Sequence, residues 1–598
     1  MNRNIINALK CLTICCGVSL YIYKLDNLLY WNVISDMFIL LGAFALLNGA
    51  DNPSERTRKF SGILSVIFTA LVVIGQMIWN NNNFSDMGSL SGIFQNALKF
   101  FGFYFLYDSL LIRLFARMKN REYKPAQNPD KVYFTVNKRS FFLMWGIIFL
   151  AWLPCLLAYW PGTLPYDAPG QARSSLKFSD MNMHHPIIHT AFIGVFYRIA
   201  LNFDNPELLP ILYALAQMLI MSAVFSFTVC YMAKIKLPFW FRVLSLSFYA
   251  FYPFNSIFSI VMAKDELHAG AVCLFFISLL SAALNPKAFF KSKMKMFLFI
   301  LAGFLFVITR NNAWPAFLIC IPALLFCFKK FWLKTAALLL AVAALHIIYN
   351  AILISALHVW KGPVKETFPF LAQQLAYVVT HHKDSLSEKD LADIYDILPE
   401  YAIPEYSPRY ADPVKGRLNE ETLKNNPGRV IFTWLRIGVR YPVGYTSAFL
   451  SNCMGFWYID AFINDPSVQR RYIETSFNTD FDPLFERKSK IPFLLDYYES
   501  FARFEGNISK TPILVTFMSV AFPLWLLILL GGILIYKNNG LVITLAPLAA
   551  LLFTVMLGPL AYGRYIYPFT ALYPMLFGLP FLARLRRRAS PRVLRGIK

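Results

Sequence analysis

The stretch FFLMWGIIFLAWLPCLLAYWPGTLPYDAPGQ, residues 141–171, joins an apolar run to a loop rich in proline and glycine. The apolar run is long enough for a helix that crosses the roughly 30 Å hydrocarbon core of a bilayer. The proline and glycine residues after it predict irregular backbone at the membrane surface. Asp167 and Gln171 lie in this loop, and His184 and His185 follow it. Because polar groups in such loops commonly serve binding or catalysis, this loop is the first candidate for a functional site.

The composition indicates a protein that crosses a membrane many times. Of the 598 residues, 57% are hydrophobic and 15% are charged, and the mean hydropathy is +0.48. The net charge of +23 comes largely from basic residues in short loops between apolar runs. This pattern is typical of cytoplasmic loops and argues against nucleic acid as a partner. We expect an all-α polytopic membrane protein with about 14 transmembrane helices, each formed by one apolar run.

The basic loops also predict which side of the membrane each segment faces. If segments 56–59 and 113–139 are cytoplasmic, both termini are cytoplasmic and Asp167 lies on the extracytoplasmic side. Segment 187–201 is expected to lie at the outer surface or to dip into the membrane, because a crossing there would place Lys234 and Lys236 outside. The expected spans are 5–23, 33–50, 58–80, 91–116, 139–159, 208–232, 240–260, 267–285, 296–309, 313–328, 335–355, 512–536, 540–560 and 563–583.

This topology divides the chain into segments. Segment 356–510 holds about 20 of the 34 acidic residues, which predicts a mostly helical extracytoplasmic lobe. Within it, Ser387 is expected to cap a helix that ends before Pro399. The other segments are a four-span block (1–120), a membrane module (139–355) with its first outer loop at 160–207, a three-span block (511–583) and a basic cytoplasmic tail (584–598).

Polar residues at the expected outer ends of the spans form one candidate site. They are Asp167, Gln171, His184, His185, Lys264, Asp265, Glu266, Arg310, Asn311, Arg564 and Tyr565. A carboxylate can take the proton of a hydroxyl group, and a guanidinium can hold a phosphate through two hydrogen bonds. Simpler roles remain open. Asp167 suits a turn, and Asp265 and Glu266 suit the first turn of a helix. Arg310 and Arg564 suit anchors at the membrane interface.

Four motifs in order, PGTLPYDAPGQ, HHP, MAKDE and RNN, resemble those of Gram-positive bacterial membrane proteins placed near the GT-C superfamily of glycosyltransferases. The resemblance covers 139–583. GT-C enzymes are polytopic and use polyprenyl-phosphate-linked sugars. The resemblance implies that Asp167 is the catalytic base or an essential acidic group. It also implies that Asp265 and Glu266 correspond to an acidic pair that binds a metal in some members. A divalent metal is possible. Because the pair reads Lys-Asp-Glu here and not Asp-x-Asp, no metal ligand is assigned.

The function implied by this resemblance is that of a glycosyltransferase of the bacterial plasma membrane. It would move a sugar from a polyprenyl-phosphate-linked donor to a glycan or lipid acceptor of the cell envelope. Asp167, Asp265 and Glu266 would be catalytic, and the other residues of the candidate site would bind substrate. Two other classes remain open. A transporter or flippase of lipid-linked glycans would carry charges at mid-span and paired broken helices. A non-catalytic envelope assembly protein would tolerate Asp167→Asn.

Overall fold

The computed structural model is built from helices. Among the described residues, the only β-pairing consists of two isolated bridges, Asn182 with Trp360 and Ser407 with Tyr410. The predicted all-α architecture is thereby confirmed for this part of the chain. The described residues are 3–26, 39–43, 47, 53–120, 137–165, 167–461, 473–475, 487–504 and 512–585. Much of the predicted span 33–50, most of the predicted basic loop 113–139 and nearly all of the predicted basic tail lie outside them.

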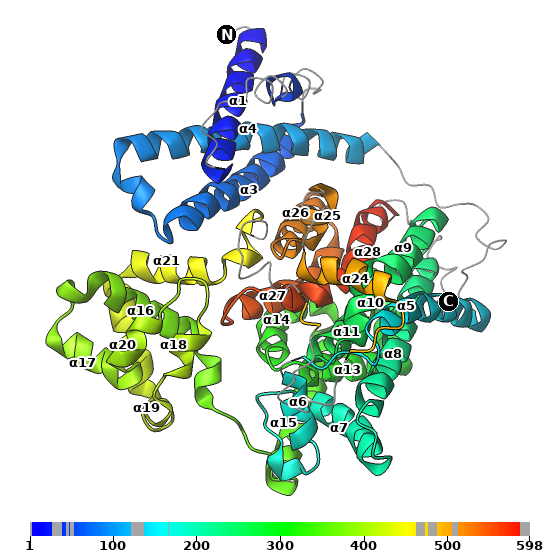
Figure 1. Cartoon of the computed structure of the whole chain (residues 1–598). Coiled ribbons are helices and arrows are strands. Elements are labelled where there is room, and N and C mark those ends of the chain that lie inside the picture. The colour runs from blue at the N-terminus through cyan, green and yellow to red at the C-terminus, as the bar shows by residue number, and fades with distance from the viewer. Residues whose placement is uncertain are drawn as a thin grey trace.

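The N-terminal block contains three long helices in its described part. They are α1 (Arg3–Asp26), α3 (Glu55–Asn81) and α4 (Leu90–Asn120), with the 3-10 turn η1 (Ser85–Gly88) before α4. Helix α4 packs against both α1 and α3 (Figure 1). It crosses α1 at Gly17 and Gly102, where a Cβ on Gly17 would lie 2.9 Å from the Cα of Gly102. The two backbones approach so closely because neither residue has a side chain.

The central body holds a single large hydrophobic core. Trp152 of α5 (Lys138–Ala158), Phe225 of α8 (Leu208–Lys234) and Tyr249 of α9 (Phe239–Phe251) show how its helices interlock. The Trp152 Nε1 donates to the Tyr249 carbonyl (3.0 Å), and the Phe225 and Tyr249 rings stack at 4.3 Å. The helices of the body are α5 (Lys138–Ala158), α6 (Asp167–Ser174), η3 (Phe178–Asp180), α7 (Ile187–Asn202), α8 (Leu208–Lys234), α9 (Phe239–Phe251), α10 (Pro253–Ile260), α11 (Lys264–Leu284), α12 (Pro286–Lys291), α13 (Lys293–Ile308), α14 (Ala313–Cys327), η4 (Lys329–Phe331), α15 (Trp332–Ala351) and the π-helical turn η5 (Ile352–Ala356).

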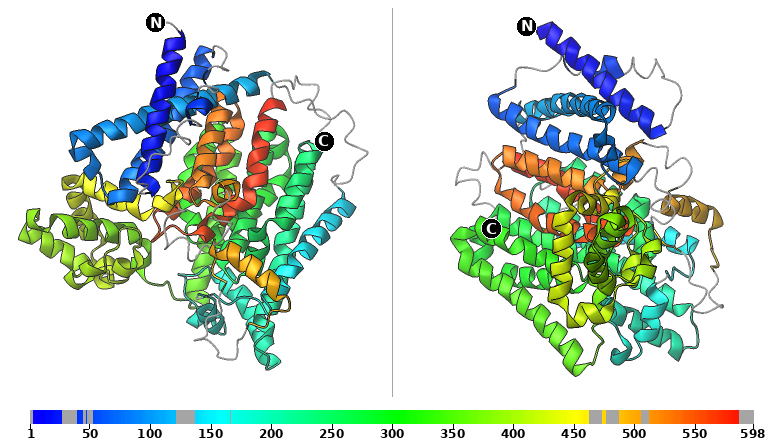
Figure 2. Two further views of the ribbon diagram at one scale, coloured as in Figure 1. Left: turned by 45° about the horizontal axis from the view of Figure 1, so that its top comes forward. Right: turned by 90° about the vertical axis from the view of Figure 1, so that its left-hand side faces the viewer.

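The last part of the chain adds further helices to this body. They are α24 (Pro492–Arg503), α25 (Pro512–Met518), α26 (Phe522–Tyr536), η10 (Gly540–Leu545), α27 (Ala546–Met556) and α28 (Gly563–Leu585). Helix α26 packs against α3, and the Phe68 and Trp525 rings stack at 5.0 Å. The right-hand view of Figure 2 shows the blue N-terminal helices stacked on the orange α26. The N-terminal block is therefore joined to the body through segments far apart in the sequence.

Several helices fit a protein that crosses a membrane more than once. Within the described residues, seven helices are long and apolar enough to cross, or eight if the bent pair α9 and α10 is one span. The predicted count of 14 is not reached and stays a prediction. Helices α14 and α26, which fall in predicted spans, have only 15 residues. A helix of that length extends about 22 Å, which is less than the roughly 30 Å of a hydrocarbon core.

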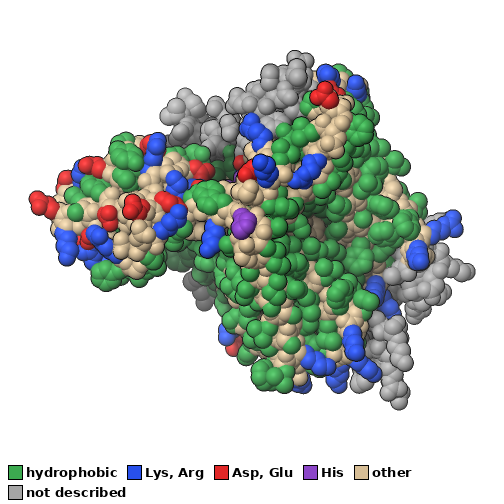
Figure 3. All heavy atoms as spheres, turned by 90° about the horizontal axis from the view of Figure 1, so that it is seen from below, with side chains coloured by type: hydrophobic (Ala, Val, Ile, Leu, Met, Phe, Trp, Pro, Cys, Tyr) green, Lys and Arg blue, Asp and Glu red, His purple; other side chains and the backbone are tan. Residues whose placement is uncertain are grey.

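A lobe beside the body has a hydrophobic core of its own, formed between Leu371 and Ala448. As predicted, Ser387 caps α17 (Glu388–Ile397): its hydroxyl accepts a hydrogen bond from the Asp390 N–H (3.1 Å), and the helix ends before Pro399. Acidic side chains gather on the lobe, whereas hydrophobic side chains cover most of the body visible in Figure 3. Its helices are η6 (Val364–Thr367), α16 (Pro369–His382), η7 (Lys383–Ser385), α17 (Glu388–Ile397), η8 (Glu400–Glu405), α18 (Asp412–Gly416), α19 (Glu420–Asn425), α20 (Pro427–Arg440) and α21 (Pro442–Asn452); η9 (Met454–Phe456) follows.

Candidate active site

Asp167 is the first residue of α6 and follows the loop that leaves α5. The loop turns at Gly162, which has a φ of +139°, and a Cβ there would lie 3.0 Å from Pro210. Glycine suits this turn because it has no side chain to clash. The Thr163 hydroxyl donates to the Ile260 carbonyl (3.3 Å) and holds the loop against the end of α10. The loop thereby sets the start of α6 beside the turn between α10 and α11.

Two cations from distant parts of the chain face this carboxylate. Arg564, near the start of α28, has its Nη1 3.8 Å from the Asp167 Oδ2. Lys264, the first residue of α11, lines the same small pocket. Gln171 also lines the pocket, together with Pro165, Met262 and Ala263. The structure therefore brings together Asp167, Gln171, Lys264 and Arg564 from three helices.

Burial and the two cations together determine the protonation of the neighbouring carboxylate and imidazoles. Burial alone would raise the pKa of Asp167, but Lys264 and Arg564 lower it below its usual value. Burial, and then the charge of Lys264, lowers the pKa of His185 to about 3 and also lowers the pKa of His184. Near neutral pH the carboxylate is ionised and both imidazoles are neutral. The positive charge of the pocket therefore comes from the lysine and the arginine.

Tyr565 connects this pocket to a buried ion pair. Its ring centroid lies 5.1 Å from the Arg564 guanidinium and 4.7 Å from the Arg310 guanidinium. Arg310, which lies between α13 and α14, pairs with Asp265 of α11. Asp265 is fully buried and Arg310 is 7% exposed. Asp167, Arg564, Tyr565, Arg310 and Asp265 thus form one continuous series of contacts.

Glu266 is next to Asp265 in the sequence but makes no such contact. It is fully buried, and neither of its carboxylate oxygens has a hydrogen-bond partner among the described residues. Neither Glu266 nor Asp265 lines the pocket that contains Asp167. Of the three carboxylates predicted to be catalytic, Asp167 is the one that borders this pocket. Catalytic roles for the other two stay predictions.

The Gln171 side chain belongs to a buried hydrogen-bond network between α6, α7 and α8. Its Oε1 accepts a hydrogen bond from the Thr190 hydroxyl (3.1 Å) and lies 2.9 Å from the His189 Nδ1. The other ring nitrogen of His189 lies 2.9 Å from the Tyr213 hydroxyl. These contacts fix α6 against its neighbours. Gln171 therefore positions the helix that carries the carboxylate, in addition to lining the pocket.

His184 and His185 lie in the turn before α7, and Asn311 fixes this turn. The Asn311 Nδ2 donates to two backbone carbonyls of the turn, at 2.8 and 2.9 Å. The His185 Nδ1 lies 3.5 Å from the Lys264 Nζ, so this imidazole borders the pocket of Asp167. The His184 Nδ1 lies 3.9 Å from a carboxylate oxygen of Glu366, which belongs to η6 at the start of the lobe. Of the two histidines, His185 is thus the closer to the candidate site.

Comparison with known proteins assigns a family to this chain. A family model described as a family of unknown function, DUF6020, matches residues 177–592, which is more than half of the chain. The chain belongs to the DUF6020 family. No curated protein and no solved structure matches it. The matched region contains every predicted site residue of this DUF6020 protein except Asp167 and Gln171.

Several polar side chains near the site of the DUF6020 protein are not among those predicted from the sequence. His189 and Tyr213 belong to the network under α6. His346 and Asn350 lie one turn apart on α15, where the Asn350 Nδ2 lies 3.0 Å from the His346 Nε2. The sequence did contain a signal for this second pair. Two polar residues four apart in an otherwise apolar helix share one face, and polar groups in such helices are commonly functional.

The possibility of a divalent metal stays a prediction. In the described part of the DUF6020 protein, no group of three or more His, Cys, Asp and Glu side chains is arranged to hold a metal ion. Asp265, a member of the predicted acidic pair, is engaged by Arg310.

Proposed function

We propose that this DUF6020 protein is a membrane glycosyltransferase that moves a sugar from a polyprenyl-phosphate-linked donor to a cell-envelope acceptor on the extracytoplasmic side. The observation that supports the proposal is the meeting of Asp167, Lys264 and Arg564 at one pocket. A carboxylate can accept the proton of an acceptor hydroxyl, and the two cations can hold a phosphate. The pocket thus combines the two kinds of group that this reaction requires.

The reaction needs one bond to form, one to break and one proton to move. The oxygen of the acceptor hydroxyl bonds to the anomeric carbon of the sugar while the bond from that carbon to the phosphate oxygen breaks. Asp167 takes the hydroxyl proton as the new bond forms. The electron pair of the broken bond stays on the phosphate, where Lys264 and Arg564 balance the growing negative charge. The polyprenyl phosphate leaves as an anion, so no separate acid is needed.

The helices that carry the two cations suit a donor with a lipid tail. Lys264 is the first residue of α11 and Arg564 the second residue of α28, and both helices are candidate membrane spans. The N-terminal ends of helices attract anions, because their free N–H groups and the helix dipole favour negative charge. A polyprenyl chain beside these helices would remain in the hydrocarbon while its phosphate reaches the pocket.

A transfer assay with Asp167→Asn tests the proposal. Purified protein in lipid vesicles is given a labelled polyprenyl-phosphate sugar and envelope extract as the acceptor source. We expect Asp167→Asn to lower the turnover rate by about 10²–10⁴-fold, the usual contribution of a general base. Asp180→Asn is the matched control, because Asp180 is an exposed acid of η3, in the middle of the same predicted outer loop.

Three results would count against the assignment. Equal transfer by the Asp167→Asn and Asp180→Asn variants would remove the catalytic role of Asp167. Movement of the lipid-linked sugar across the bilayer without any transferred product would favour the transporter alternative. If the wild-type protein shows neither transfer nor transport, the non-catalytic assembly role is favoured.

A further inference from the structure

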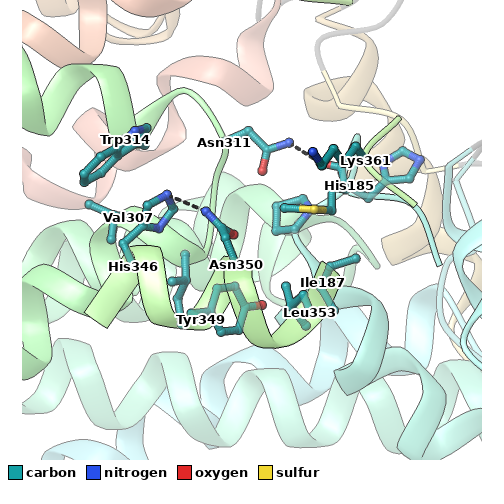
Figure 4. Close-up of a pocket in the computed structure, with 13 residues that line it drawn as sticks. His185, Ile187, Val307, Asn311, Trp314, His346, Tyr349, Asn350, Leu353 and Lys361 are labelled. Carbon is teal, nitrogen blue, oxygen red and sulfur yellow. Dashed lines mark hydrogen bonds between the residues drawn. The ribbon is translucent and has the colours of Figure 1, made fainter. Parts of the chain in front are cut away.

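A second pocket, of about 220 Å³, lies beside the pocket of Asp167. It is bounded by the end of α13, the start of α14, the last turns of α15 and the turn before α7 (Figure 4). Its volume is smaller than the about 300–1,000 Å³ of sites for drug-sized ligands, so it suits one ring. The lining residues are Met183, His185, Pro186, Ile187, Val307, Ile308, Asn311, Trp314, His346, Tyr349, Asn350, Leu353 and Lys361.

The polar groups of this second pocket favour a hydroxylated ligand without positive charge. Among the residues that the structure describes, no carboxylate lines it, and Lys361 is the one lysine or arginine in its lining. The Asn311 Oδ1 can accept a hydrogen bond, and the Asn350 amide offers its Oδ1 and the N–H that does not face His346, which suits hydroxyl groups. A cationic ligand would meet Lys361 with no carboxylate to offset the repulsion. The pocket therefore selects neutral or anionic ligands.

Aromatic rings form one wall of the second pocket. The rings of Trp314 and His346 stack at 4.3 Å across α14 and α15, as Figure 4 shows. The Asn350 amide lies 3.0 Å from the His346 Nε2, and the Nδ1 of the same ring is buried with no hydrogen-bond partner among the described residues. Flat apolar surfaces next to a few polar groups bind ligands that have both a carbon face and hydrogen-bonding edges. A sugar ring has both.

A single side chain, that of His185, separates the second pocket from the proposed phosphate site. His185 lines it, and the same imidazole lies 3.5 Å from the Lys264 Nζ, which lines the pocket of Asp167. A ring held in the second pocket is therefore adjacent to the cations and the carboxylate. This arrangement places a sugar where it could be transferred or could receive a transferred sugar.

We infer that the pocket between α13, α14 and α15 binds one neutral or anionic sugar ring of a substrate. This inference rests on the proposed glycosyltransferase function and adds to it the position and charge selectivity of a sugar subsite. The ring belongs either to the lipid-linked donor or to the end of the acceptor glycan. Both sources share the same chemistry, and the experiment distinguishes them.

Binding of simple glycosides by the full-length protein in nanodiscs tests the sugar subsite. Saturation-transfer NMR is recorded with methyl glucoside, methyl glucuronide and glucosamine, which are neutral, anionic and cationic at neutral pH. We expect the first two to bind and Trp314→Leu to weaken them by about tenfold, through loss of aromatic contact. Trp332→Leu is the matched control, because Trp332 is exposed at the opposite end of α15 and should leave binding unchanged.

Two further variants keep the test decisive if Trp314→Leu fails to fold. Asn350→Ala should also weaken glycoside binding, because it removes an amide from the pocket wall. Lys361→Glu should reverse the charge preference, so that glucosamine binds better than the glucuronide. The inference is overturned if no glycoside binds, if the pocket variants bind as well as the wild type, or if Lys361→Glu leaves the charge preference unchanged.

Binding of two lipids, an isoprenyl phosphate with a sugar and one without, shows whether the bound sugar ring belongs to the donor or to the acceptor. If the donor sugar fills the pocket, Trp314→Leu weakens binding of the sugar-bearing lipid but not of the bare isoprenyl phosphate. If the acceptor fills it, Trp314→Leu raises the KM for the acceptor alone. Asp167→Asn should lower transfer by the same factor of about 10²–10⁴ while glycoside binding persists. If the wild-type protein transfers sugar but shows no glycoside selectivity, the subsite alone is overturned. If the wild-type protein binds glycosides but transfers no sugar, the proposed function alone is overturned.

Discussion

Breaking the buried ion pair between Asp265 and Arg310 should destabilise the protein strongly. Asp265 is fully buried, and its Oδ2 has no hydrogen-bond partner among the described residues. Arg310 is therefore the group that balances this carboxylate. Arg310→Met leaves a negative charge without a partner in the interior. Asp265→Asn leaves the guanidinium, which is 7% exposed, without its anion.

The expected size of the effect follows from burial. Removing one partner of a buried ion pair costs about 3–5 kcal/mol. Lys383 with Glu400 is an exposed pair, with side chains 54% and 64% exposed, and solvent screening makes such pairs contribute little to stability. Arg310→Met and Asp265→Asn should therefore each cost several times more stability than Lys383→Met. The double variant at the buried site removes both charges and should recover part of the loss.

Denaturant unfolding of the purified variants, followed by tryptophan fluorescence, measures these differences. The wild type, the two single variants and the double variant at the buried pair form one thermodynamic cycle. Lys383→Met gives the scale for a surface pair. The reasoning is refuted if Arg310→Met costs no more than Lys383→Met. It is also refuted if the losses of the two single variants simply add in the double variant, because the two charges would then be independent.

Two other predictions concern the site and the packing. The pKa of Asp167 lies below its usual value partly because of Lys264. Lys264→Met should therefore raise that pKa and move the acid limb of the pH–rate profile for sugar transfer to higher pH. An acid limb that stays in place or moves to lower pH would contradict this cause. Gly75→Ala should destabilise the protein, because its Cβ would lie 2.1 Å from the Tyr458 ring, whereas Gly146→Ala meets nothing within 4 Å and should stabilise the helix by about 0.5–1 kcal/mol. Thermal unfolding of both variants checks this, and equal effects would show that the glycine at position 75 is not needed for close packing.

The sequence was sufficient for features that depend on neighbouring residues. Hydropathy over a window of residues predicted the long apolar helices, such as α5 and α8. The hydroxyl of Ser387 and the position of Pro399 predicted the start and end of α17, because a cap and a stop act within one turn. The number of crossings was less accessible. Helices α14 and α26 fall in predicted spans but have only 15 residues each, fewer than the roughly 20 that a straight crossing needs.

The candidate site depended on contacts that local sequence does not specify. Each polar residue could be placed at the end of an apolar run, but the sequence did not show that Arg310 is paired with Asp265 or that Glu266 is buried without a partner. It also gave no indication that Gln171 is held in a network under α6. These differences arise because burial and pairing are set by helices that pack together from distant parts of the chain.

What the amino-acid sequence determined by itself is the class of protein: a helical chain with several helices long and apolar enough to cross a membrane, and a polar lobe. Hydrophobicity and helix capping act over a few residues, so they can be read along the chain. Only the tertiary structure decided that Asp167, Lys264 and Arg564 meet at one pocket and that a second pocket lies beside it. Such a meeting depends on the packing of α6, α11 and α28, which hydropathy and local motifs do not encode.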